Sequence, residues 1–173
     1  YLDCPKIKFV KRSKASASDE ASTEEAMLEY FEKNKCSNIV LIQATSPLLS
    51  SVDVCGAIKK FEDDNADSLL TVTNYKRFLW KYSKGNPEAL NYNYFKRPRR
   101  QDYNGFYEEN GALYISDYKG FINHKNRLFG KISLFVMDSF KSIEIDSIDD
   151  FDYCEKTFTS CHKKNFSQNK ENN

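Results

Sequence analysis

Short apolar runs alternate with amphipathic segments in the first half of the chain, and this alternation constrains the fold more than any other feature. Asn38 to Ile42 is an apolar run rich in β-branched residues, which predicts a strand buried on both faces. From about Ser51, apolar side chains recur at helical spacing, and the run from Ala66 to Val72 predicts another strand. Strands that alternate with helices are typical of an α/β domain with a mostly parallel sheet flanked by helices.

The remaining elements are predicted from capping residues and periodicity. Ser22 with Glu25 and Ser147 with Asp150 have the spacing of capping boxes, so helices are expected to begin there, the second one ending near Thr159. A further short helix is expected over residues 118–123. Apolar or alternating runs predict the other strands, at 6–10, 78–82, 112–115, 131–137 and 142–146.

One long segment interrupts this pattern. Residues 74–111 show no helical period and are rich in Tyr and Asn, which predicts an inserted excursion whose aromatic content argues against disorder. We therefore expect one domain over residues 1–161, followed by a polar, disordered tail over 162–173. The chain starts at Tyr1 without a methionine, so we expect it to begin inside a larger protein.

Composition excludes several classes of protein. The chain has 26 Lys and Arg against 25 Asp and Glu, a net charge of +1, which argues against binding to nucleic acid by bulk charge. No apolar run approaches the roughly 20 residues of a membrane span, so no membrane association is expected. The 5 cysteines form no CxxC pair and are odd in number, which indicates a reduced compartment and an intracellular, cytoplasmic location.

Two groups of polar residues could support chemistry. Gln43, Thr45 and Ser46 follow a predicted strand, where α/β sheets bind ligands, but their side chains could equally stabilise the loop through backbone hydrogen bonds. Glu144 and Asp146 lie two residues apart in a predicted strand, so they would share a face and repel each other unless a cation lay between them. Such oxygen ligands suit Mg²⁺. The alternative is that Asp146 caps the next helix and Glu144 is solvated.

The excursion adds a basic run and a glycine. Four cations lie within the five positions from Lys96 to Arg100, and they could clamp an anionic substrate, contact nucleic acid, form a nuclear-import address or be a solvated loop. Gly111 follows Asn110 and precedes a predicted strand, which allows a tight turn or a close approach of the backbone to a ligand.

Four segments resemble, in the same order, motifs of the CMP-sialic acid synthetase, or N-acylneuraminate cytidylyltransferase, family. Residues 12–23 resemble its R-x₆-D-x₂-[ST]-S stretch, and Leu41 to Pro47 resembles its L-[LI]-Q-x-T-S-P. Residues 97–102, followed by 109–114, resemble its basic RRQD-type segment and its E-N-G-A-x-Y. Ser142 to Asp146 resembles its S-[IV]-D-I-D metal segment, so that the resemblance covers nearly the whole chain.

The resemblance implies a Rossmann-like nucleotidyltransferase fold, Mg²⁺ as cofactor, CTP and sialic acid as substrates, and a homodimer in which the excursion reaches the partner's site. The implied reaction joins the anomeric hydroxyl of the sugar acid to the α-phosphorus of CTP and releases pyrophosphate. The implied roles are catalysis by Arg99 and Arg100, nucleotide binding by Arg12, Ser22, Thr23 and Gln43, sugar binding by Gln43, Arg99, Gln101, Asn110 and Tyr114, and metal binding by Glu144 and Asp146.

The chain departs from the family's pattern at several places, one of which is Leu49, where many bacterial members of the family carry Arg. Glu144 stands where the family has Asp, so Asp149 could complete the metal site instead. The family's Gly/Lys/Arg-rich phosphate loop, which would hold the triphosphate through backbone N–H groups, is not among these residues, and we expect the chain by itself to be inactive.

Rival interpretations remain open. The substrate could be a related keto-sugar acid, such as legionaminic acid, pseudaminic acid or Kdo. The chain could also be an inactive regulatory relative, or a nucleic-acid-binding module built on residues 96–100, against which the near-neutral charge argues. The same basic run could direct the protein to the nucleus.

Overall fold

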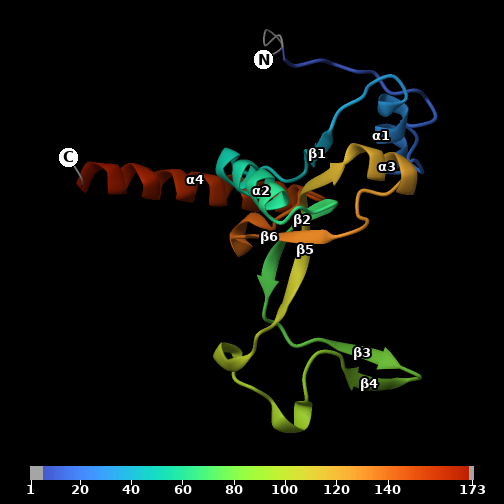
Figure 1. Cartoon of the computed structure of the whole chain (residues 1–173). Coiled ribbons are helices and arrows are strands. Elements are labelled where there is room, and N and C mark those ends of the chain that lie inside the picture. Colours follow the sequence, from blue (N-terminus) through green and yellow to red (C-terminus); the bar gives the residue numbers. More distant parts are fainter. Residues whose placement is uncertain (1–5, 172–173) are drawn as a thin grey trace.

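The computed structural model describes residues 6–171, with side chains through Thr159, and its elements follow one another in an α/β order (Figure 1). The helices and strands are α1 (Thr23–Phe31), β1 (Asn38–Ile42), α2 (Ser51–Asp63), β2 (Ser68–Tyr75), β3 (Trp80–Ser83), β4 (Asn86–Ala89), β5 (Phe106–Asp117), α3 (Tyr118–His124), β6 (Ile132–Met137) and α4 (Ile148–Glu171). Three short 3₁₀ turns are η1 (Tyr94–Lys96), η2 (Arg100–Asp102) and η3 (Ser139–Lys141).

The main sheet has four strands in the order β1-β5-β2-β6. β5 pairs antiparallel with both β1 and β2, whereas β2 and β6 pair parallel. β1, β2 and β6 therefore run in the same direction, and β5 lies among them in the opposite one. Three of the four strands thus share one direction, and the predicted α/β class with a mostly parallel sheet and flanking helices is confirmed.

The prediction that the strand over 38–42 is buried on both faces was wrong. β1 lies at the edge of the described sheet, and Val40 and Ile42 are 40% and 50% exposed. An apolar run of five residues does not distinguish a central strand from an edge strand, because neighbouring strands and helices decide what covers it.

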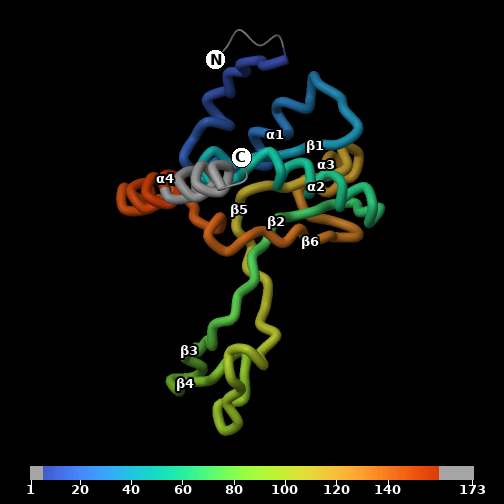
Figure 2. The backbone as a smooth tube through the Cα atoms, turned by 90° about the vertical axis from the view of Figure 1, so that its left-hand side faces the viewer, coloured from blue at the N-terminus to red at the C-terminus, as the bar shows by residue number. Residues whose placement is uncertain are grey.

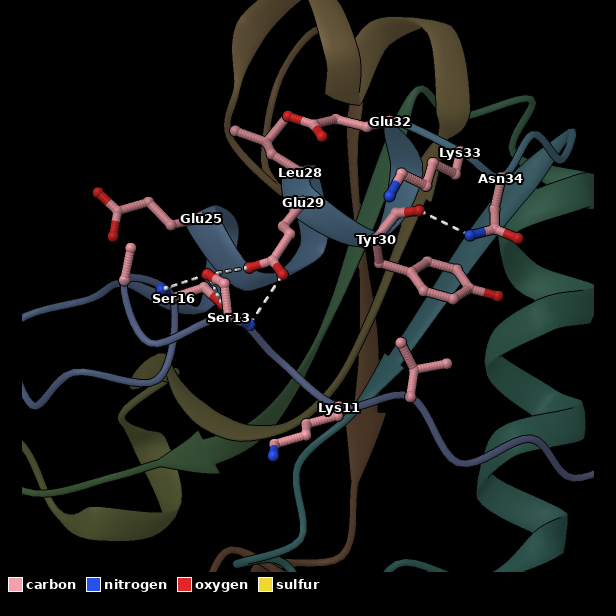
Figure 3. A pocket seen from close by; sticks show the side chains of 12 residues that line it. Lys11, Ser13, Ser16, Glu25, Leu28, Glu29, Tyr30, Glu32, Lys33 and Asn34 are labelled. Carbon is pink, nitrogen blue, oxygen red and sulfur yellow. Dashed lines mark hydrogen bonds between the residues drawn. The ribbon is translucent and has the colours of Figure 1, made fainter.

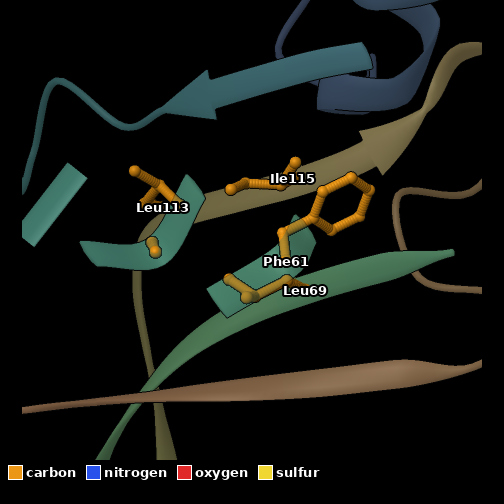
Figure 4. Packing of buried hydrophobic residues seen from close by; sticks show 5 residues of the cluster. Phe61, Leu69, Leu113 and Ile115 are labelled. Atoms are coloured by element: carbon orange, nitrogen blue, oxygen red, sulfur yellow. The ribbon is translucent and has the colours of Figure 1, made fainter. Parts of the chain in front are cut away.

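The core forms on both faces of the sheet. On one face, Ala57 and Phe61 of α2 pack against Leu69 of β2 and against Leu113 and Ile115 of β5 (Figure 4). Burying each of the larger side chains contributes roughly 2 kcal/mol. The opposite face holds two further clusters, one centred on Leu70, Val72 and Tyr114 and one on Ile39, Phe121 and Phe129.

The predicted capping boxes set the starts of two helices. The Ser22 hydroxyl accepts a hydrogen bond from the Glu25 backbone N–H, and the Glu25 carboxylate accepts one from the Ser22 backbone N–H. Ser147 and Asp150 make the same reciprocal pair at the start of α4. These bonds satisfy backbone donors that the first helical turn leaves free. A third box, which the sequence pattern did not single out, joins Ser50 and Asp53 at α2.

Other predicted elements differ from those observed. Residues 6–10 form no strand, because they add to no sheet edge and Phe9 stays 85% exposed. β5 begins at Phe106, six residues before the predicted strand, because its first part pairs with the end of β2. α4 continues to Glu171 beyond its predicted end and through most of the expected tail, because no Pro or Gly after Gly130 ends it. Residues 172–173 lie outside the described residues.

The strand predicted at 142–146 is also absent. Its alternating pattern arises because Ile143 and Ile145 are half-buried while Glu144 and Asp146 are exposed, and not because the segment belongs to a sheet. Ile145 instead lines a small apolar hollow with Leu48. Period-2 burial in an irregular segment looks the same in sequence as a strand.

The predicted excursion is a projecting arm. β2 and β5 extend past the sheet and lead into residues 76–105, which hold the β3–β4 hairpin, η1 and η2 and point away from the helices in both views (Figures 1 and 2). Aromatic rings order the arm: Phe78 lies 4.3 Å from Tyr92 and 5.0 Å from Tyr103, centroid to centroid, and the Arg97 guanidinium lies 4.7 Å above the Phe78 ring. Within residues 6–171, no helix combines the length and apolar character needed to cross a membrane.

Candidate active site

The turn after β1 and the segment before α4 meet directly. The Gln43 backbone N–H donates to the Ala112 carbonyl oxygen over 3.1 Å, and the Ile145 backbone N–H donates to the Thr45 carbonyl oxygen over 2.9 Å. These two bonds bring Gln43, Glu144 and Asp146 into one neighbourhood although about 100 residues separate them in sequence. The half-buried Gln43 side chain makes no hydrogen bond to the rest of the described chain, so its amide is free to bind a ligand.

Glu144 lies against the backbone of β5 at Gly111. Gly111 has a φ of +64°, and a Cβ atom placed there would lie 1.7 Å from Glu144 Oε1. Glycine is therefore required twice, for the left-handed conformation and for the close approach. The sequence pattern anticipated a close approach at this glycine, and the group that approaches in the structure is a side chain of the same protein.

The electrostatics around Glu144 indicate crowded negative charge. The pKa of Glu144 is raised above its ordinary value. Partial burial is the largest cause, followed by the negative charges of Asp146 and Glu109. Carboxylates that raise one another's pKa are close enough for a bound cation to relieve their repulsion. Mg²⁺ commonly uses one or two protein carboxylates and takes its other ligands from water and phosphate. The donor set of Glu144 and Asp146 therefore fits Mg²⁺ held jointly with a nucleotide.

A complete metal cage does not form from these side chains. No group of three or more His, Cys, Asp or Glu residues suited to a metal ion occurs within the described part of the chain. Asp149, the alternative ligand, lies in the first turn of α4. Asp146 does not cap that helix, because Ser147 and Asp150 make the capping bonds. The capping role predicted as an alternative for Asp146 is therefore excluded, and Asp146 is either a metal ligand or a solvated carboxylate.

Tyr114 of β5 lies close to the same carboxylates. Its hydroxyl donates a short hydrogen bond to Glu109 Oε1, and its ring belongs to the buried cluster with Leu70 and Val72. Burial and the neighbouring Glu109 raise the pKa of Tyr114 far above its ordinary value, so the hydroxyl keeps its proton and acts as a donor. Tyr114 is 5% exposed, so its ring is part of the core next to these carboxylates.

Asn110 is placed differently from its expected role. It is 2% exposed, its side-chain amide donates to Met137 Sδ over 3.4 Å, and its side-chain oxygen accepts from the Ala112 backbone N–H over 3.4 Å. These contacts are those of a residue that holds the irregular part of β5 in place. Its binding of a sugar stays a prediction that this geometry does not favour.

The expected nucleotide residues lie around the start of α1. Thr23 lines a hollow of about 300 Å³ together with Ile39 and Leu41 of β1, just before Gln43. The Ser22 hydroxyl is engaged as the helix cap, and Arg12 is exposed. Within residues 6–159, no hydrogen bond or ion pair joins Arg12 or Ser22 to Gln43 or Glu144, whereas Thr23 lies near the end of β1 that leads to Gln43.

Another hollow lies elsewhere, between the N-terminal segment and α1 (Figure 3). It has a volume of about 750 Å³ and is lined by Ser13, Ser16 and Glu29, among others, and by none of the candidate site residues. The Glu29 carboxylate accepts hydrogen bonds from the Ser13 backbone N–H and hydroxyl, both over 2.9 Å. Hydrogen bonding by Ser16 and then by Ser13 lowers the pKa of Glu29. This hollow therefore reflects how Glu29 anchors the segment after Arg12.

The basic residues of the arm are far from this centre in a single chain. Arg99, Arg100 and Gln101 are exposed at η2, on the part of the arm that projects away from the sheet (Figures 1 and 2). Arg99 makes a loose ion pair of 3.7 Å with Asp102, in which both side chains are mostly exposed. One chain therefore does not unite Arg99 and Arg100 with Gln43 and Glu144.

Sequence reasoning missed a buried ion pair that holds the Glu144 segment. Lys141 of η3 donates to Asp53 over 2.6 and 2.9 Å and to the Ser50 hydroxyl over 3.4 Å, and the two charged side chains are 16% and 11% exposed. Burial by itself would raise the pKa of Asp53, but the hydrogen bonds from Lys141 and Ser50 outweigh it and lower the pKa. The spacing of Ser50 and Asp53 as a capping box was available in the sequence, but the partner 88 residues away was not.

Comparisons with known proteins name the same family as the sequence motifs. N-acylneuraminate cytidylyltransferase B of Danio rerio is 31% identical over 144 residues, which make up 80% of this chain and 34% of the relative. N-acylneuraminate cytidylyltransferase of Streptococcus agalactiae serotype V is 24% identical over 151 residues, 84% of this chain and 36% of the relative. Over most of its length, this chain is similar in sequence to members of the CMP-sialic acid synthetase family.

A third relative differs in name from the synthetase family. Post-translational flagellin modification protein B of Campylobacter coli is 29% identical over 154 residues, 83% of this chain and 64% of the relative. No protein-family model matches the chain. The chain spans about a third of the length of the cytidylyltransferases that it matches.

Proposed function

We propose that the protein is a nucleotidyltransferase that activates sialic acid with CTP to give CMP-sialic acid and pyrophosphate. The observation that supports this most strongly is the Ile145–Thr45 backbone hydrogen bond, which holds Glu144 and Asp146 beside Gln43. A carboxylate pair next to an amide that can donate and accept hydrogen bonds suits a metal-bound nucleotide. The similarity to cytidylyltransferases of fish and bacteria supports the same reaction class.

In the proposed reaction, a bond forms between the anomeric oxygen of the sugar acid and the α-phosphorus of CTP. The bond from the α-phosphorus to the bridging oxygen breaks, pyrophosphate leaves, and the hydroxyl proton passes to solvent. Mg²⁺, when bound, would neutralise phosphate charge and orient the leaving group. Glu144 and Asp146 would hold that ion, and Gln43 would lie between nucleotide and sugar. Thr23 and Arg12 would bind the nucleotide from the α1 side.

The sugar side of the site requires cations, because sialic acid carries a carboxylate. We propose a homodimer in which Arg99, Arg100 and Gln101 of one copy reach the Glu144 centre of the other. This proposal is supported by the projecting arm and its exposed aromatic side chains, among them Phe95, which is 85% exposed. A guanidinium can hold a carboxylate through two parallel hydrogen bonds.

A related keto-sugar acid is the second candidate substrate. The relative named as a flagellin modification protein supports this alternative, because it matches 83% of the chain and its name does not mention sialic acid. The reaction and the metal would be the same, and only the groups that contact the sugar substituents would differ. A nucleic-acid role for residues 96–100 has less support, since Arg97 packs on the Phe78 ring instead of standing free.

The decisive experiment measures pyrophosphate release by the protein at its full natural length. CTP and Mg²⁺ are combined in turn with sialic, legionaminic and pseudaminic acids and with Kdo, and GTP and UTP serve as nucleotide controls. We expect turnover with sialic acid that requires CTP and is lost on addition of EDTA. The chain of 173 residues, assayed in parallel, is expected to be inactive. Absence of turnover with every acid would contradict the proposed function.

We also propose an intracellular location, where CTP is available. The basic run at 96–100 is proposed to act in the site, and no observation on the structure or the relatives supports its use as a nuclear address.

A further inference from the structure

Arg127, which no sequence motif singles out, joins three elements of the fold. It lies in the connection from α3 to β6, and its guanidinium donates to both carboxylate oxygens of Glu24 in α1, over 2.6 and 3.3 Å. The two side chains are 22% and 18% exposed. The Arg127 backbone oxygen accepts a hydrogen bond of 2.7 Å from the Ser116 hydroxyl of β5. The residue is thus held at its backbone and at its charged end.

The same guanidinium covers the ring of Tyr114. Its central carbon lies 4.6 Å from the ring centroid, within the range of a cation–π contact. The Tyr114 hydroxyl is fixed by Glu109, and the ring packs among Leu70 and Val72. The ring is therefore constrained by a hydrogen bond at one end, by apolar packing and by a flat cation.

The Arg127 guanidinium also offsets negative charge around the Tyr114 ring. Glu109 and Glu144 both place negative charge near Tyr114, and Arg127 opposes their effect. A planar guanidinium can stack on a ring while its edge donates to a carboxylate, but a lysine ammonium cannot satisfy both geometries. An arginine is therefore the residue type that this position requires.

We propose that Arg127 is a positioning residue that fixes the Tyr114 ring in the sugar site, while Glu24 of α1 holds the Arg127 guanidinium in place. This inference rests on the proposed function and on the sugar-binding role that the family resemblance implies for Tyr114. The Glu24–Arg127 ion pair fixes the charged end of Arg127 over the Tyr114 ring. Arg127 itself acts only through these neighbours.

The kinetic test compares Arg127→Met and Arg127→Lys with the wild type at full natural length. A displaced binding group raises KM, so Arg127→Met should raise the KM for the sugar acid roughly tenfold and change kcat and the KM for CTP by less than about twofold. Arg127→Lys, which keeps the charge, should have an intermediate effect. Lys59→Met, on the exposed side of α2, is the matched control and should leave all three constants unchanged.

A second readout does not depend on turnover. In protein labelled with carbon-13 tyrosine, the Tyr114 ring signal is assigned by its loss in Tyr114→Phe. The signal should shift in Arg127→Met, less in Arg127→Lys and not at all in Lys59→Met. If the signal shifts but the wild type turns over no acid, the proposed function fails while the ring contact is confirmed.

The positioning role would be overturned by either of two results. One is an unchanged KM for the sugar acid in Arg127→Met. The other is a parallel change in kcat and in both KM values, which would indicate a general structural defect. If Arg127→Met does not fold, Arg127→Lys decides the matter by the same two measurements.

Discussion

Replacing Gly111 with alanine tests the link between backbone geometry and the metal site. At a φ of +64°, a residue with a side chain costs about 1 to 2 kcal/mol, of which a more restricted unfolded chain returns roughly 0.5 kcal/mol. The new Cβ would also lie 1.7 Å from Glu144 Oε1, so the carboxylate must move. We expect Gly111→Ala to lower the free energy of unfolding by about 0.5 to 1.5 kcal/mol through the backbone, and further through the displaced carboxylate, and to weaken the apparent affinity for Mg²⁺.

Gly85 is the matched control for this experiment. Its φ is +83°, but a Cβ there would meet nothing within 4 Å. Gly85→Ala should therefore show the conformational cost without any effect on Mg²⁺. Urea unfolding measures the first quantity, and the Mg²⁺ dependence of pyrophosphate release measures the second.

A double variant separates the two contributions at Gly111. In a Glu144→Ala background, Gly111→Ala should cost no more stability than Gly85→Ala, because nothing remains to be displaced. The reasoning is refuted if Gly111→Ala and Gly85→Ala have the same effect on both the free energy of unfolding and the Mg²⁺ dependence.

Three further predictions follow from the same site. Lys141→Met should lower the free energy of unfolding by about 2 kcal/mol at neutral pH, because it leaves the Asp53 carboxylate buried without its cation. Because the pKa of Asp53 is lowered in the folded protein, the Lys141–Asp53 pair stabilises the fold at pH values above the ordinary carboxyl pKa. The difference in free energy of unfolding between Lys141→Met and wild type should therefore shrink as the pH falls below about 4. Glu144→Gln should weaken the Mg²⁺ dependence of activity. Because the pKa of Glu144 is raised in the folded protein, its ionised form opposes folding, so the variant should have an unchanged or higher Tm at neutral pH. A clear drop in Tm would contradict this. When the Arg99→Ala and Gln43→Ala proteins are mixed and exchange subunits, half of the dimers should contain one copy of each variant. Each mixed dimer would have one intact site of two, so about a quarter of wild-type activity should return. No recovery would argue against a site shared between copies.

Local sequence determined most of the elements of this protein. The capping boxes at Ser22 and Ser147 and the apolar runs of β1, β2 and β6 act over a few residues, so they could be located without the fold. The grouping of Gln43 with Glu144 and Asp146 also came from sequence, but through resemblance to a family and not through local physics.

Tertiary structure decided the contacts that no short segment specifies. Whether β1 is central or at an edge depends on its neighbours, and residues 142–146 alternate in burial although they belong to no strand and meet the turn after β1 through a hydrogen bond to Thr45. The partners of Tyr114 and Asp53 were likewise invisible in sequence, because Arg127 and Lys141 reach them across loops whose paths depend on packing. Periodicity reports which residues turn inward, whereas only the assembled fold determines what they meet there.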